Sequence, residues 1–230
     1  MKTTSKTMAG LLRAGIYLIV ALTAGLGLGA CTTTTIDEFR QGDTGINTGE
    51  SIVILGRRQG AAYETGADFV ECVGNRMGRG NGAITVVPEQ TFVDALFPWF
   101  EPRTAPMRSE DLQQLMAQPL VTDKMAEFGV RYIVWLDGQT ETSNRMGSIS
   151  CAVGPGGGGC FGFGSWEDDS SFEARIWDVS SHTAVGTISA DASGQSYVPA
   201  VFVPIPLIAR VEANACNSLA DQLKQFVIGG

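Results

Sequence analysis

Short apolar runs bounded by glycine, proline or polar residues recur along the chain and predict the strands of a sheet. Residues 51–56 and 130–136 are continuous runs rich in Val, Ile and Leu, as expected of buried strands. Residues 172–179 alternate apolar and polar side chains, so this strand should turn one face to the core. After a turn, residues 184–192 return as the second strand of a hairpin. Together with residues 83–87, the pattern predicts about five strands.

Apolar positions at helical spacing predict the other elements. One helix is expected from Thr65, its N-cap, to Met77, with four apolar side chains on a single face. Three shorter helical segments are expected between residues 89 and 129, and a last helix covers roughly residues 211–227. This mixed order of strands and helices is typical of an α/β (α+β) fold, a single mixed sheet with helices packed against it.

Two regions fit neither pattern. Residues 137–171 are rich in glycine and do not alternate, so we expect a long insertion without strands before the C-terminal hairpin. Residues 197–208 are apolar, but prolines at 199, 204 and 206 exclude a regular helix or a central strand.

The N-terminal segment predicts export from the cytoplasm. Three basic residues and no acidic ones accompany an apolar stretch over residues 14–28, which is shorter than the roughly 20 residues that span a bilayer as a helix. The chain then reads Leu28-Gly29-Ala30-Cys31, which resembles the lipobox of bacterial lipoproteins. That resemblance implies a signal peptide over residues 1–30, its removal, and lipidation of Cys31 by acyl chains such as palmitate.

The residues after Cys31 predict where the protein is held. Thr32 stands where an Asp would favour retention at the inner membrane, so by resemblance to lipoproteins we expect the outer membrane, with the domain facing the periplasm. Residues 31–50 are polar and contain glycine, and we expect them to form a flexible tether. Residues 51–230 then form a single periplasmic domain, a size that supports one hydrophobic core.

Charge excludes one class of partner. Without its leader the chain has 13 Lys and Arg against 24 Asp and Glu, a net charge of −11. Nucleic-acid binding requires clustered basic side chains that neutralise phosphates, so we expect no nucleic-acid partner.

Four cysteines remain besides Cys31, an even number that favours disulfides in an exported chain. Four cysteines allow three connectivities. Cys151 and Cys160 flank a short loop, which favours a local bridge and leaves Cys72 to pair with Cys216. A zinc site is the less favoured alternative, because close Cys-x-x-Cys spacing and histidine ligands are missing.

Three segments resemble the domain shared by the curli secretion lipoprotein CsgG, the lipoprotein PelC and the N-terminal domain of TolB. Residues 129–138 read GVRYIVWLDG, residues 175–186 contain RIWDV, a turn and AVG, and residues 86–90 read VVPEQ. The resemblance covers most of residues 51–228. It implies a CsgG-like domain that works in the cell envelope, and self-association into a homo-oligomer.

No catalytic, metal or cofactor constellation stands out in the sequence. His182 is the single histidine and lies in a predicted turn, so it is a weak base for Ser165 or Ser181. Residues 156–159 lack the Gly-Lys-Ser/Thr of a phosphate loop, and residues 167–169 lack the spacing of a calcium loop. We therefore expect a protein that is not an enzyme and that carries no metal or cofactor.

The aromatic residues beside the Gly-rich loop are the candidates for an interaction patch. Phe161, Phe163 and Trp166 would form an apolar surface for a partner protein or a membrane if exposed, or would cover the sheet if folded back. The favoured hypothesis is a lipid-anchored interaction or assembly component of an envelope or secretion complex. The alternative is a small-ligand-binding lipoprotein with a pocket beside the Gly-rich insertion.

Overall fold

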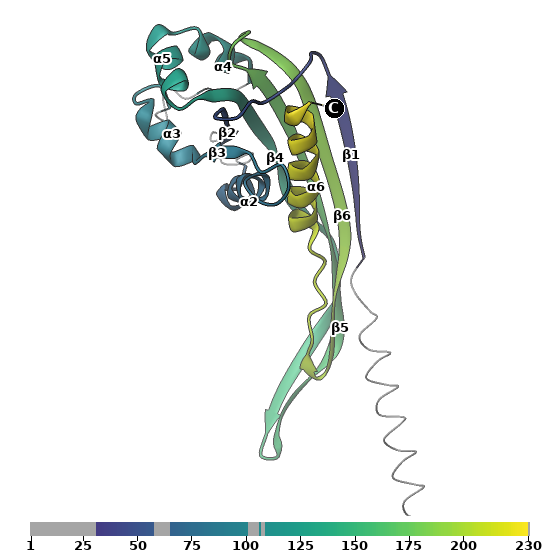
Figure 1. Ribbon diagram of the computed structural model, residues 1–230. Coiled ribbons are helices and arrows are strands. Elements are labelled where there is room, and N and C mark those ends of the chain that lie inside the picture. The colour runs from purple at the N-terminus through teal and green to yellow at the C-terminus, as the bar shows by residue number, and fades with distance from the viewer. Residues whose placement is uncertain (1–30, 58–64, 101–105, 107–108, 230) are drawn as a thin grey trace, which may run out of the picture.

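The computed structural model describes residues 31–57, 65–100, 106 and 109–229, so the predicted signal peptide lies outside the described residues. The strands are β1 (Thr32–Arg40), β2 (Ser51–Gly56), β3 (Thr85–Val87), β4 (Val130–Gly154), β5 (Gly157–Asp178) and β6 (Thr183–Pro204). The helices are α2 (Ala67–Met77), α3 (Glu89–Ala95), α4 (Ser109–Met116), α5 (Pro119–Glu127) and α6 (Val211–Ile228). Figure 1 shows their arrangement.

The strands form one mixed sheet in the order β1-β6-β5-β4-β2-β3. β2 runs parallel to both β3 and β4, whereas the pairs β4–β5, β5–β6 and β6–β1 are antiparallel. The predicted α/β fold with a single mixed sheet is therefore confirmed, with six strands where the sequence indicated about five.

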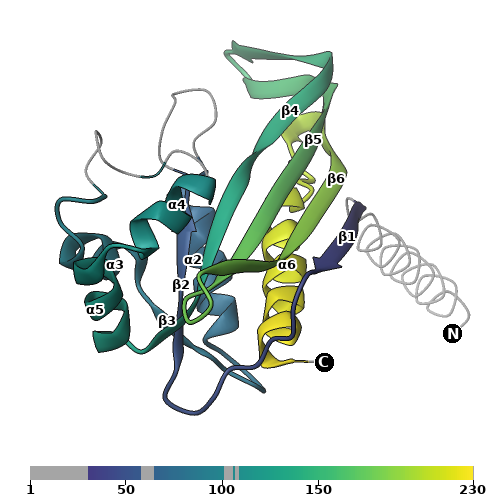
Figure 2. The same cartoon turned by 90° about the horizontal axis from the view of Figure 1, so that it is seen from above.

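Helices pack on both faces of the sheet at the end where β2 and β3 lie (Figures 1 and 2). Side-chain alternation along β2 sends Ile52 and Ile54 into a core shared with α2 and α6. Val53 and Leu55 point the other way, into a second core with α3, α4 and α5. Along β5 and β6 most buried apolar side chains belong to the α6 core, and Trp177 of β5 alone is a buried member of the second core, so the face opposite α6 is open farther along these strands.

The α2 helix begins differently from the sequence prediction. Its N-cap residue is Gly66, and no side chain caps it. The Thr65 hydroxyl instead donates a hydrogen bond of 3.2 Å to the carbonyl of Leu136, so it ties the chain to β4.

The expected tether is wrong for residues 32–40. These nine residues form β1, which pairs with β6 in register from Thr32 opposite Gly194 to Arg40 opposite Gly186. Four consecutive threonines have high strand propensity, and the edge of β6 offers them backbone hydrogen-bonding partners. The polar composition that indicated a tether is that of a solvent-facing edge strand.

The prediction of a Gly-rich insertion without strands is also wrong. Residues 137–154 continue β4, and residues 157–171 belong to β5, which pairs with β4 as far as the turn at Gly154 and Gly157. Successive glycines removed the alternation that identifies a strand in sequence. β4, β5 and β6 reach 25, 22 and 22 residues, and their ends project well beyond the helices (Figure 1).

The apolar segment after Tyr197 is partly regular. β6 runs to Pro204 at the edge of the projecting sheet, where the N–H missing from a proline costs little. The chain then turns back, and Tyr197 and Leu207 exchange two backbone hydrogen bonds, of 2.9 and 2.7 Å. The prolines were therefore compatible with an edge strand, as well as with the irregular segment that we expected.

Two disulfides are present, and they join the pairs favoured by the sequence. Cys72 of α2 bonds Cys216 of α6, across 144 residues of sequence. Cys151 and Cys160 face each other on β4 and β5, near the end of the projecting hairpin. The first bridge fastens two helices over the core, and the second fastens the hairpin end.

Candidate functional site

Cys31 is exposed and lies directly beside the sheet. The next residue, Thr32, already pairs with Gly194 of β6. A Cβ atom placed on Gly194 would come within 3.2 Å of the carbonyl oxygen of Cys31, which shows how closely the two backbones approach. A lipid attached to Cys31 would therefore be joined to the folded domain without an intervening tether.

The projecting ends of β4, β5 and β6 carry most of the large apolar side chains that are exposed. On the described residues, Val153 is 91% exposed, Phe161 55% and Phe202 66%. The others in this part of the molecule are Met146, Phe163, Val201, Val203, Ile205 and Ile208. Such a concentration is unusual for a solvated surface and is typical of interaction sites.

The same part of the sequence has no charged side chain. Neither residues 146–166 nor residues 195–209 contain Asp, Glu, Lys, Arg or His. We call these two segments the charge-free end. Charges resume at Arg145 on β4 and Glu167 on β5.

The predicted interaction patch lies in this end, with one difference. Phe161 and Phe163 are exposed, whereas Trp166 is half-buried and its indole N–H donates to Asp168 at 3.0 Å. The structure adds residues that the sequence interpretation missed, above all Phe202. The centroid of its ring lies 5.1 Å from that of Phe161. The absence of charge in two segments far apart in sequence was the signal that could have linked them.

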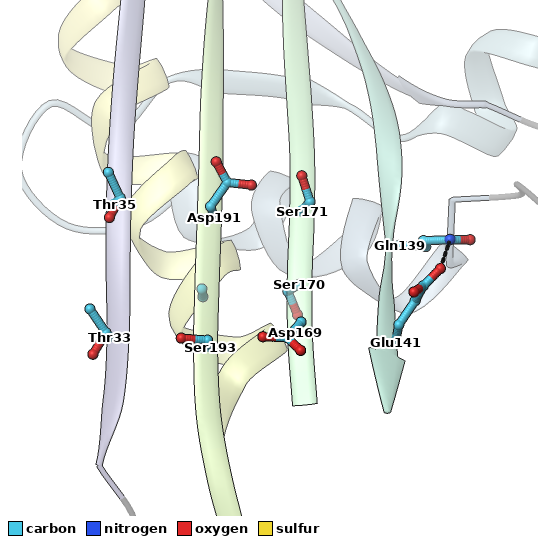
Figure 3. A pocket seen from close by; sticks show the side chains of 10 residues that line it. Thr33, Thr35, Gln139, Glu141, Asp169, Ser170, Ser171, Asp191 and Ser193 are labelled. Atoms are coloured by element: carbon cyan, nitrogen blue, oxygen red, sulfur yellow. Dashed lines mark hydrogen bonds between the residues drawn. The ribbon is translucent and has the colours of Figure 1, made fainter. Parts of the chain in front are cut away.

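A hollow of about 470 Å³ lies on the open face of β1, β6, β5 and β4. Because Phe172 and Ala190 point into the α6 core, their neighbours Ser171 and Asp191 point to the opposite face. Figure 3 shows the polar side chains that line the hollow in two rows across the strands. One row holds Thr35, Asp191, Ser171 and Gln139, and the other holds Thr33, Ser193, Asp169 and Glu141.

The hollow is acidic. Glu141 accepts a hydrogen bond of 2.6 Å from the Gln139 amide, and Asp169 accepts one of 3.3 Å from the Ser143 hydroxyl. None of the described residues that line the hollow is Lys or Arg. Its chemistry is that of a hydrogen-bonding, anionic surface, which would attract polar or positively charged groups and repel phosphates.

The candidate catalytic residues named from the sequence do not form a catalytic arrangement. His182 lies in the turn between β5 and β6, with its carbonyl accepting a hydrogen bond from Gln113. Ser165 is buried far along β5, opposite Tyr197 in the projecting sheet. Ser181 lies next to His182 in sequence, but its hydroxyl is bonded to that of Thr183 at 2.7 Å.

The acidic run does not form a cation site. Glu167 and Asp169 point to one face of β5, and Asp168 points to the other, where it is bonded to Thr142 and Trp166. Within residues 31–57, 65–100 and 109–229, no group of three potential metal ligands lies close enough to hold an ion. No helix in the described parts of the chain is both long and apolar enough to cross a membrane.

Comparisons with known proteins give structural likenesses only. No protein-family model matches the sequence, and no curated protein matches it. A dodecamer of PelC from Paraburkholderia phytofirmans, carrying a point mutation, is similar with a TM-score of 0.41 and 13% identity, over 86% of this chain and 100% of that chain. Another PelC dodecamer from the same organism gives a TM-score of 0.39 and 12% identity, over 86% and 99%. At these values neither likeness assigns a function to this chain.

Proposed function

We propose that this protein is a lipid-anchored, periplasm-facing component of a cell-envelope or secretion complex, which acts by binding and assembly and not by catalysis. The observation that carries the proposal is the charge-free end, where exposed Phe161, Phe202 and Val153 leave an apolar surface uncovered by the rest of the described chain. An exported protein with a surface of this kind needs something to cover it.

The position of Cys31 supports the anchored form of this proposal. The sequence before Cys31 resembles a lipoprotein signal. The Cys31 side chain is exposed, so a lipid attached to it could extend away from the domain. Two or more acyl chains hold a protein stably on a bilayer, whereas one chain holds it only reversibly. Thr32 favours the outer membrane, and the domain would then face the periplasm.

The acidic open face limits which partners fit. A net charge of −11 for the chain from Cys31 onward, with Asp169, Asp191 and Glu141 on the open face, disfavours nucleic acid. Envelope proteins are the partners that fit best, and further copies of this chain are included among them.

The test is cross-linking in the intact cell envelope followed by gentle extraction. A photoreactive residue replaces Phe163 on the projecting sheet or, in a matched control, the exposed Leu120 of α5. The complex is then extracted in mild detergent and its mass and composition are measured. We expect defined adducts, with protein or with lipid, from the Phe163 position and a complex heavier than one chain. A monomer that gives no adducts from either position would contradict the proposal.

The hollow supports a second candidate function, binding of a small polar ligand. Its volume of about 470 Å³ lies in the range of ligand sites, and it lies beside the Gly-rich segment of residues 137–171. Because its carboxylates face solvent, the ligand would be polar or cationic. Titration with small polyamines and amino sugars would test this: binding that Asp191→Asn weakens would support it, and the absence of any heat of binding would count against it.

A further inference from the structure

The projecting sheet and the lipidation site point to the same side of the molecule. Thr32, Gly194 and Asp168 form one row across β1, β6 and β5. Cys31 precedes this row on the side of the projecting ends, and Figure 1 shows the start of β1 directed the same way as those ends. A lipid anchor at Cys31 would therefore place the membrane on the side of the molecule toward which the charge-free end extends.

The level at which charge disappears coincides with the level of Cys31. Cys31 lies one residue beyond Thr32, which brings it level with Gln195 of β6 and Glu167 of β5. Glu167 is the last charged residue of β5 on the way to the hairpin end, and no charged residue follows in β6 after Asp191. Charge ends where the lipid begins, as expected of a surface that passes from water into a membrane interface.

We propose that the charge-free end lies in the interfacial layer of the membrane that holds the acyl chains of Cys31. This inference rests on the proposed lipid anchor and adds a second point of attachment, built from protein side chains. A lipid layer can cover both faces of the sheet, and neither face carries a charge beyond Arg145 of β4 and Glu167 of β5. A docking surface for one protein would need only one apolar face.

The reach of the strands is sufficient. From Gln195 to Phe202 the chain advances seven residues, or about 23 Å at roughly 3.3 Å per residue of strand. A whole hydrocarbon core is about 30 Å thick, so the exposed side chains can pass the headgroups. Glycines at 154 and 156–159 make the hairpin end itself narrow.

Backbone hydrogen bonding limits the depth. Beyond Leu136 the outer edge of β4 pairs with no strand of the described chain, so its N–H and C=O groups need water or another partner. Open strand edges do not occur in the hydrocarbon region, because unsatisfied backbone groups are costly there. The interfacial layer supplies water and lipid carbonyls to that edge while still covering Phe161 and Phe202.

The experiment uses the full mature lipoprotein reconstituted in vesicles of phosphatidylethanolamine and phosphatidylglycerol with brominated acyl chains. Tryptophan is introduced at Phe161 in the charge-free end, or at Phe39 as the matched control. The two side chains are 55% and 63% exposed, and Phe39 lies near the opposite end of β1. Val153→Trp provides a second probe should the Phe161 change disturb folding. Vesicle flotation is measured on the same samples.

We expect the added emission at 161 and 153 to shift to the blue and to be lost in brominated vesicles, with the emission at 39 unchanged. Flotation without quenching at 161 and 153 would overturn the inference and leave the anchor standing. Quenching equal at all three positions would also overturn it, because the charge-free end would then have no special contact. Failure both to float and to be quenched would remove the anchor as well as the inference.

Discussion

At the scale of single residues, Gly138 decides how β4 can leave the body of the sheet. Its φ of +148° lies where side-chain-bearing residues rarely occur, and a Cβ there would lie 2.2 Å from the carbonyl oxygen of Ser171. The Cβ would also meet the backbone of Phe172, which faces Gly138 across the two strands. Only glycine fits at this point, just after the residues of β4 that pair with β2.

Replacing this glycine should be costly. Gly138→Ala combines backbone strain with a clash against a partner strand, so we expect a loss of about 3 kcal/mol in unfolding free energy. The measurement is urea denaturation. Gly164→Ala is the matched control, since its nearest neighbour is a side-chain atom of Ile149 at 3.9 Å. Equal costs for the two variants would show that β4 does not have this conformation at residue 138.

An ion pair between α2 and α6 makes part of the stability depend on acid. Arg76 donates two hydrogen bonds, of 3.0 and 2.9 Å, to the carboxylate of Asp221. These bonds, together with the charges of Arg76 and Lys224, lower the pKa of Asp221 although partial burial opposes the shift. A carboxyl group whose pKa is lower in the folded state adds stability above its unfolded pKa of about 3.9, and this is lost as the pH falls through the folded value.

The variant Asp221→Asn should therefore be less stable than the parent at neutral pH, and the difference should shrink below about pH 4. Because both side chains are about half exposed, the effect is small, and thermal unfolding followed at several pH values is the suitable measurement. Asp123→Asn, at an exposed site in α5, controls for the loss of one negative charge. A difference that grows on acidification would refute the assigned direction.

At the scale of elements, the sequence predicted those parts whose periodicity is intact. The bounds expected for β2 agree with the structure, and those of α6 differ by one residue, because their apolar patterns are uninterrupted. The outer halves of β4 and β5 were missed because glycine has no side chain with which to show alternation. β1 was missed because its outward-facing threonines and charged residues have the composition of a tether. Strand pairing, which the sequence does not display, forms these elements: the outer halves of β4 and β5 pair with each other, and β1 pairs with the distant β6.

The two disulfides should differ in their contribution to stability. Cys72–Cys216 closes a loop of 144 residues between α2 and α6, whereas Cys151–Cys160 closes one of nine. In the chain-entropy account these loops correspond to about 5 and about 2.5 kcal/mol.

Paired alanine variants measured by urea denaturation should follow that order. The Cys151→Ala, Cys160→Ala pair should leave the core intact but loosen the register of the hairpin end, where glycines specify pairing weakly. Hydrogen exchange of residues 146–164 would report that loosening. A larger loss of stability from the Cys151, Cys160 pair than from the Cys72, Cys216 pair would contradict this assignment.

At the scale of the whole molecule, the candidate site was only partly predictable. The sequence named Cys31 and two of the exposed aromatic residues, Phe161 and Phe163, because local motifs and composition mark them. It could not show that Phe202 joins them, since that contact depends on the pairing of β5 with β6. The acidic hollow is likewise formed by side chains from four paired strands, and the sequence around each of these residues does not indicate that they lie together.

The lipid anchor at Cys31 is the feature on which the proposed position of the domain depends most, because β1 begins one residue after it. The direct measurement is mass spectrometry of the N-terminal peptide of the protein isolated from membranes. We predict a chain that begins at Cys31 and carries acyl groups on that residue. A chain that retains residues 1–30, or one that begins at an unmodified residue and is recovered without membranes, would show that the protein is not anchored through Cys31.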